Sequence, residues 1–281
     1  MRLESHADAE AFLARAGELL GADEARHNLP LGICSTLIET PSAYPQAFFW
    51  TVENGGPLAA FLMTPPFNIV VAKPRDPDAL AFAAAELHAG GVGPPGAGGA
   101  RPEVDEFVAA WEQVAGARRR LRMAHGVYAA REARVPSGVP GELREAQPSD
   151  QQLVLRWLRA FQEEALPGES ARDDLDRVVE RRLASPSGGF ALWEVDSRPV
   201  SLCGYAGLTP HGIRIGPVYT PAELRRHGYA SALTAHVTKR LLDGGRDYCF
   251  LFTDLANPTS NKIYMDVGYE LVCEAADYAF D

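Results

Sequence analysis

A short polar segment in the second half of the chain has the residue types needed to hold a diphosphate. It precedes a stretch whose apolar residues recur at helical spacing, and it consists of Arg225, Arg226, His227, Gly228, Tyr229, Ala230 and Ser231. The first turn of a helix offers backbone N–H groups without intrahelical partners, together with the positive end of the helix dipole. Gly228 permits close approach of a ligand, and no proline between 222 and 231 removes a donor. The segment therefore predicts a phosphate-binding helix start.

A second group of polar residues follows the next apolar run. Asn257 and Pro258 are typical of a helix start, with Asn as the cap and Pro in the first helical position. Ser260, Asn261 and Tyr264 follow within the first two turns. Two interpretations of Tyr264 stay open: a phenol that exchanges a proton with a substrate, or a core tyrosine whose hydroxyl bonds a backbone group.

Alternating strands and amphipathic helices must position these two groups. The expected strands cover 142–146, 190–195, 200–208, 213–219 and 248–253, with a turn at 196–199 between the second and the third. Two short strand-like segments at 269–273 and 277–280 close the chain. The expected helices run from Ser149 or Asp150 to about 166, over 173–183, over 228–243, and from 257 to just before 268. Each polar group thus stands between a strand and the helix that follows it.

The first half repeats part of this pattern. Residues 48–71 align with 190–215, and in both copies a strand pair precedes a helix, at 78–88 and at 228–243. A further helix at 102–114 and a strand at 121–130 complete the first half. We infer a diverged duplication rather than two unrelated domains that share hairpin composition. The Pro- and Gly-rich stretch at 135–141 is the predicted linker between a domain at 1–134 and a domain at 142–281.

The second domain resembles the GNAT (Gcn5-related N-acetyltransferase) family through VYTPAELRRHGYASAL and TDLANPTSNKIYMDVGYE. The resemblance implies an α/β fold with a mixed sheet, two GNAT-like domains in tandem, and CoA inserted between two splayed strands. It places the pantetheine and thioester on the backbone of Val218, Tyr219 and Thr220, and the pyrophosphate on 225–231. By the same resemblance, Asn257, Ser260 and Asn261 lie beside the pantetheine arm, and Tyr264 protonates the departing thiolate.

The expected function is an N-acyltransferase that moves an acetyl group from acetyl-CoA to an amine by direct attack. The acceptor is a small-molecule amine, a lysine or an N-terminal amine. The general base stays open among Glu163, Glu164, Glu169 and His211. The alternative is a non-catalytic acyl-CoA sensor or scaffold, which would keep the phosphate site and lose the chemistry.

The first half lacks this phosphate-binding pattern. At the corresponding helix start it has Lys73, Pro74, Arg75, Asp76 and Pro77, in which two prolines remove donors and an acid repels phosphate. Residues 91–96 match G-x-G-x-x-G by letter, but no strand precedes them and two prolines interrupt them. We interpret the glycine-rich stretch at 90–100 as a flexible loop.

Composition excludes several other classes. The net charge of −10 argues against a nucleic-acid partner, and no apolar run is long enough for a membrane helix. The seven histidines form no close-spaced pair, so no metal site is expected. The four cysteines are scattered, which favours reduced, mostly buried thiols in a cytoplasmic protein that is a monomer or a homodimer.

Overall fold

The computed structural model describes residues 1–165 and 174–281. The chain forms two compact units. Unit 1 contains Met1–Tyr128, Phe252–Pro258 and Leu271–Asp281, and unit 2 contains Ala129–Leu251 and Thr259–Glu270. The units are therefore not continuous along the chain. The domain limits expected from the sequence, 1–134 and 142–281 with a linker at 135–141, stay predictions.

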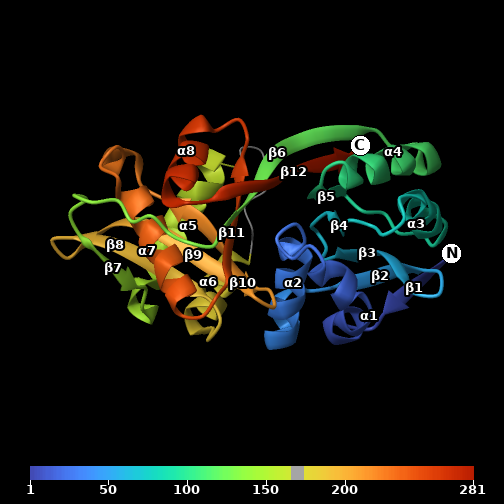
Figure 1. The fold of residues 1–281 in the computed structure, drawn as a ribbon, viewed down its shortest axis with the longest axis horizontal. Coiled ribbons are helices and arrows are strands. Elements are labelled where there is room, and N and C mark those ends of the chain that lie inside the picture. Colours follow the sequence, from blue (N-terminus) through green and yellow to red (C-terminus); the bar gives the residue numbers. More distant parts are fainter. Residues whose placement is uncertain (166–173) are drawn as a thin grey trace. The chain divides into compact units, whose positions relative to one another are not determined.

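The order of helices and strands occurs twice (Figure 1). The first series is β1 (Arg2–His6), α1 (Ala9–Gly21), α2 (Asn28–Glu39), β2 (Phe48–Glu53), β3 (Pro57–Met63), β4 (Ile69–Val71), α3 (Asp78–Ala89), β5 (Gly96–Ala100), α4 (Glu103–Ala115) and β6 (Arg119–Ala130). The second is β7 (Glu142–Glu145), α5 (Gln151–Ala165), α6 (Leu175–Ala184), β8 (Gly189–Val195), β9 (Arg198–Leu208), β10 (Gly212–Tyr219), α7 (Tyr229–Asp243), β11 (Tyr248–Asp254), α8 (Pro258–Val267) and β12 (Glu270–Phe280). The same β-α-α-β-β-β-α-β-α-β order in both halves agrees with the duplication inferred from the sequence.

Unit 1 is a mixed sheet covered by helices on both faces. Its strands lie in the order β1-β2-β3-β4-β5-β12-β6, and β4 and β5 are parallel. One face carries a core of α1 and α2 side chains around Phe49 and Leu62. The other face carries α3 and α4 around Phe61 and Trp111. Neighbouring residues of β2 and β3 supply the two cores in alternation, as the two-residue period of a strand requires.

The glycine-rich stretch is not the flexible loop that the sequence suggested, because Gly96–Ala100 forms the central strand β5. Glycine is rare in strands, so propensity argued against this assignment. Close packing explains the composition. A Cβ atom at Gly96 would lie 1.9 Å from the carbonyl oxygen of Tyr278, and one at Gly99 would lie 2.6 Å from that of Val71. Only glycine allows both neighbouring backbones to approach this closely.

The last strand of the chain completes the sheet of unit 1. The two segments expected at 269–273 and 277–280 are one continuous strand, β12, which pairs antiparallel with β5 from Ala275↔Ala100 to Ala279↔Gly96. The Asn68 amide donates to the Asp277 carboxylate at 2.6 Å beside this pairing. A partner strand that lies far away in sequence therefore decides the length of β12.

Unit 2 repeats the layered arrangement around the strands β11-β10-β9-β8-β7. Phe190 and Leu192 of β8 pack against α5 and α6, whereas the ring of Trp193 meets His236 of α7 at 5.1 Å. The predicted turn between β8 and β9 is confirmed, with Asp196 and Ser197 at positive φ. The four cysteines are free thiols, as expected. No helix within the described ranges combines the length and apolarity needed to cross a membrane.

Candidate functional site

The connection from β10 to α7 turns sharply before the helix begins. A short 3-10 turn, Ala222–Leu224, leads to Arg226 and Gly228, which both have positive φ, of 69° and 82°. Gly228 is the N-cap of α7. A left-handed backbone there favours glycine, and a Cβ atom would also lie 3.0 Å from a methyl group of Val139. The sequence thus supplies glycine at the position where the turn requires it.

Six consecutive backbone N–H groups, those of residues 226–231, are available at this helix start. The first helical hydrogen bond of α7 runs from the N–H of Ala232 to the carbonyl of Gly228 at 2.9 Å. Within the described residues, none of the six N–H groups donates to a protein acceptor, and no side chain caps the helix. Residues 225–228 are exposed and residues 229–231 are partly exposed. The geometry fits a diphosphate, which needs several convergent donors in reach of solvent.

The two arginines of this segment have different surroundings. The Arg225 guanidinium pairs with the carboxylate of Glu164 on α5 and donates to the Thr220 carbonyl at 2.8 Å. The Tyr219 hydroxyl donates to the same carboxylate at 3.1 Å. Arg226 is exposed and forms no ion pair within the described part of the chain. Arg226 therefore carries the uncompensated positive charge at the helix start, and Arg225 mainly fixes the loop.

His227 and Tyr229 form the outer surface of the turn. Their rings stack at 5.3 Å between centroids, and His227 Nδ1 lies 3.3 Å from the Leu224 carbonyl oxygen. Ala230 and Ser231 complete the first turn of α7 without obstructing its N–H groups. The residues predicted for the phosphate site are thus contiguous and share one exposed surface.

The end of β10 leads directly into this turn. Val218 and Tyr219 pair with Cys203 and Leu202 of β9, whereas pairing with β11 ends at Arg214↔Phe250. The other edge of β10 therefore has no ladder with β11 beyond Arg214, as expected for strands that diverge. The Ser201 hydroxyl lies 3.1 Å from the Tyr219 carbonyl and 2.8 Å from the hydroxyl of Thr220, which holds this strand end in place.

Helix α8 begins at Pro258, where the sequence predicted a helix start. Ser260 and Asn261 lie in its first turn, within unit 2. Asn257 precedes the helix and belongs to unit 1. Its place beside the pantetheine arm stays a prediction.

Tyr264 lies on α8 with its ring edge-on to Tyr269, at 6.1 Å between centroids. Burial raises the pKa of the Tyr264 phenol above its usual value, with a smaller contribution from Cys203 on β9. The phenol is therefore protonated at neutral pH, but a raised pKa also makes it a weaker acid, so its role as the proton donor to the thiolate stays a prediction. The neighbouring Tyr269 hydroxyl instead bonds Thr238 at 2.8 Å, so Tyr269 is the core tyrosine of this pair.

The candidate bases differ in position. Glu163 is exposed at the end of α5, and both oxygens of Glu164 are used by Arg225 and Tyr219. His211 precedes β10 and stands seven residues before Val218, about 23 Å along an extended strand, which is too far to act at that strand end. Glu169 lies outside the described residues.

The cysteine thiols are poor nucleophiles in this structure. Cys203 and Cys249 are fully buried, and burial raises the pKa of Cys249 to about 12 and that of Cys203 further. Attack on a thioester requires the thiolate, which this environment disfavours. Among the described residues there is also no group of three His, Cys, Asp or Glu side chains placed to hold a metal ion.

Unit 1 has a helix start at the corresponding place, where β4 leads into α3, but most of its N–H groups have protein acceptors. Lys73 N–H donates to His27 Nε2 at 3.0 Å, and Asp78 N–H donates to the Asp76 side chain at 3.0 Å. Three further N–H groups donate to backbone carbonyls, namely those of Arg75, Ala79 and Leu80. Pro74 and Pro77 have no N–H to offer.

Comparison with known proteins identifies the family of one part of the chain. The model of the acetyltransferase (GNAT) family matches residues 152–269, which include the β10–α7 turn and most of α8. Residues 152–269 are a GNAT domain. Members of this family take the acyl group from acyl-CoA and act on amine acceptors, and the exposed N–H groups at 226–231 lie inside the matched range. No curated protein sequence matches the chain.

Solved structures extend the GNAT likeness to both halves. A GCN5-related N-acetyltransferase from Sphaerobacter thermophilus is 17% identical, with a TM-score of 0.64, over 98% of this chain and 94% of that chain. A tandem GNAT protein from the clavulanic acid biosynthesis pathway is 16% identical, with a TM-score of 0.59, over 100% and 98%. A Drosophila protein is 14% identical, with a TM-score of 0.69, over 99% and 98%. At these identities the likeness concerns the fold, and it confirms an α/β tandem GNAT fold.

Proposed function

We propose that the GNAT domain is an N-acyltransferase that transfers an acetyl group from acetyl-CoA to an amine. The observation that carries this proposal is the row of six backbone N–H groups at 226–231, which have no protein acceptor within the described residues. Such a row, open to solvent at a helix start, matches the diphosphate of CoA in charge and donor geometry.

The proposed cofactor residues divide by the part of CoA that they hold. The N–H groups of 226–231, with Arg226, hold the diphosphate. The free edge of β10 at Val218, Tyr219 and Thr220 holds the pantetheine and the thioester, since β11 does not pair there. Ser260 and Asn261 on α8, with Asn257 before it, border the arm. Arg225 positions the loop through Glu164 and Thr220.

Bound acetyl-CoA supplies an activated acetyl group as a thioester. A backbone N–H near Val218 or Tyr219 donates to the carbonyl oxygen as negative charge develops on it. The unprotonated acceptor amine attacks directly, because Cys203 and Cys249 are buried thiols with raised pKa values. Tyr264 keeps its proton at neutral pH and gives it to the sulfur as the C–S bond breaks.

The acceptor class follows from charge. With a net charge of −10, the chain attracts cationic acceptors, such as small-molecule amines, lysine side chains or N-terminal amines. The free thiols fit a reducing compartment, and we place the protein in the cytoplasm as a monomer or homodimer.

The test is consumption of acetyl-CoA across a panel of polyamines, aryl-alkyl amines, aminoglycosides and lysine peptides. We expect turnover with at least one amine, and turnover about 100-fold slower when Tyr264 is replaced by Phe. Tight CoA binding without acetyl transfer to any class of amine would contradict the proposed enzymatic activity. It would favour the alternative, a non-catalytic acyl-CoA-binding protein.

A further inference from the structure

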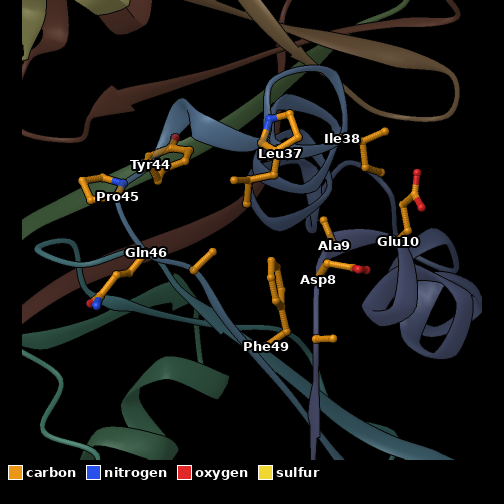
Figure 2. A pocket seen from close by; sticks show the side chains of 12 residues that line it. Asp8, Ala9, Glu10, Leu37, Ile38, Tyr44, Pro45, Gln46 and Phe49 are labelled. Carbon is orange, nitrogen blue, oxygen red and sulfur yellow. The ribbon is translucent and has the colours of Figure 1, made fainter.

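Unit 1 contains a cavity of about 450 Å³ beside the start of α1. Its walls come from the first turn of α1, the last turn of α2, the segment after the 3-10 turn Pro41–Ala43, and the start of β2. Figure 2 shows Tyr44 and Pro45 on one side, Asp8 and Glu10 on the other, and Phe49 and Leu37 between them. All of these residues belong to unit 1.

This cavity is not the first half's version of the CoA site. Phe49 and Leu37 belong to the core on the α1 and α2 face of the sheet. Ala79 and Leu80, at the start of α3, belong to the core on the opposite face. The cavity and the occupied helix start are therefore on different sides of the same sheet, and the cavity needs an explanation of its own.

The inner wall of the cavity is apolar. Ala9, Leu37 and Phe49 are nearly fully buried, and Ile38 remains 44% exposed at the edge. The volume lies in the range of small-molecule sites, and the open lining offers polar and apolar surface in similar amounts. Water against the apolar inner wall is displaced favourably by a ring or an alkyl chain.

The charged residues of the lining are all acidic. Asp8 and Glu10 border the cavity, and the lining contains no Lys, Arg or His. Some acids of unit 1 have arginine partners, as in Glu53 with Arg15 and Glu103 with Arg26. Asp8 uses one oxygen to cap the N–H of Ala11 at 2.8 Å, and neither Asp8 nor Glu10 has a basic partner within the described ranges. Both acids lie at the N-terminal end of α1, whose dipole offsets part of their charge, and the lining contains no basic side chain, so the rim favours a cation over an anion.

We propose that this cavity binds an organic cation with a planar apolar body, of the aryl-alkyl ammonium class. The ring packs between Phe49, Leu37 and Tyr44, and the ammonium group faces the carboxylates of Asp8 and Glu10. This binding is separate from acetyl transfer in unit 2, because every residue of the cavity lies in unit 1 and CoA takes no part.

The test compares two probes of the same shape and opposite charge, tryptamine and indole-3-propanoate, by calorimetry on the full-length protein without CoA. We expect tryptamine to bind in a salt-dependent manner and indole-3-propanoate to bind at least about tenfold more weakly. Ala47→Trp, which fills the cavity from its rim, abolishes tryptamine binding at this site. Glu10→Gln weakens tryptamine about twofold to fivefold and leaves the helix cap Asp8 in place.

The control for charge is Glu86→Gln, an equal change on α3 at the other face of the sheet, which leaves tryptamine affinity unchanged. Thermal unfolding checks that Ala47→Trp is folded, and Ile38→Ser, which removes exposed apolar surface, provides a second variant with weaker binding. The proposal is overturned if the two probes bind equally, if tryptamine does not bind, or if folded Ala47→Trp binds it like the wild type.

Discussion

The starts of α7 and α3 occupy the same place in the two repeats, yet they differ in every feature that phosphate binding requires. At α7 six consecutive N–H groups have no protein acceptor within the described residues, and Arg226 adds an exposed positive charge. At α3 most of the N–H groups donate to His27, to Asp76 or to backbone carbonyls, and two prolines have none. The fold alone therefore does not make an anion site.

The two helix starts differ in the side chains of only a few residues. Gly228 has no side chain to cap α7, whereas Asp76 accepts the N–H of Asp78 and places a negative charge where a phosphate would lie. His27, from the end of the loop between α1 and α2, takes the N–H of Lys73. In the first repeat, protein groups thus satisfy donors that a ligand would otherwise satisfy.

The largest effect is expected from Gly228→Pro. Proline cannot adopt a φ of 82° and removes one donor, so CoA affinity falls by more than about 100-fold. Gly245→Pro, at a positive-φ position after the other end of α7, is the matched control and keeps CoA affinity. Calorimetry measures both. Equal loss in the two variants would mean that helix integrity, rather than the N–H row, holds CoA.

The residue at the position of the proposed general acid also differs between the two repeats. Tyr264 stands four residues before Gly268, which ends α8, and Glu112 stands four residues before Gly116, which ends α4. Glu112 accepts the N–H of Arg119 at 2.8 Å, which is a structural role. We expect Tyr264→Phe to lower the rate of acetyl transfer about 100-fold with CoA affinity nearly intact. A rate within twofold of the wild type, in single-turnover kinetics, would leave Tyr264 as a packing residue.

His27 makes the occupied helix start sensitive to pH. Nε2 accepts the N–H of Lys73, so Nδ1 carries the proton and donates to the Leu20 carbonyl at 2.9 Å. Burial lowers the pKa of His27 below its usual value, which outweighs the effect of the Leu20 hydrogen bond. The neutral form is favoured in the fold, so stability is complete above about pH 6.5 and falls as the pH drops toward the lowered pKa.

His27→Gln tests this account through urea unfolding at several pH values. We expect a loss of about 1–3 kcal/mol at pH 7.5, since two buried hydrogen bonds are disturbed. The variant also has a flatter dependence of unfolding free energy on pH between 7.5 and 5. If the free energy of unfolding changes with pH to the same extent in the wild type and the variant, His27 is not the titrating group.

The smallest effect is expected at the ion pair beside the α7 start. Glu164→Gln removes the charge that neutralises Arg225, so CoA affinity rises about twofold to fivefold at low salt and the gain fades at high salt. Glu163→Gln, one residue earlier and exposed, is the control for net charge. Weaker CoA binding in Glu164→Gln would mean that positioning of Arg225 outweighs its charge.

Local patterns in the sequence predicted most of unit 2. The helical spacing after Gly228, the Asn-Pro start of α8 and the turn at Asp196 each depend on neighbouring residues, and the structure confirms all three. The contiguous residues of the phosphate site were found for the same reason, and their role in binding CoA stays a prediction.

Features that depend on distant partners were not predictable from local patterns. Strand β5 is glycine-rich because Tyr278 and Val71 approach its backbone, and neither neighbour is near it in sequence. The pairing of Glu164 with Arg225 joins residues 61 positions apart, and His27 reaches Lys73 across 46. No periodicity in the sequence indicates such contacts. The role of Glu164 in fixing the loop, and the protein acceptors at the start of α3, are therefore seen only in the structure.

The number of CoA molecules bound per chain tests the central comparison most directly. We expect titration calorimetry of the full-length protein to give one site per chain, with an affinity between low micromolar and sub-millimolar, and to give no site in Gly228→Pro. The second repeat alone would then bind CoA, as expected from its N–H groups at 226–231, which have no protein acceptor within the described residues. Two equivalent sites per chain, or a site that survives in folded Gly228→Pro, would contradict the account.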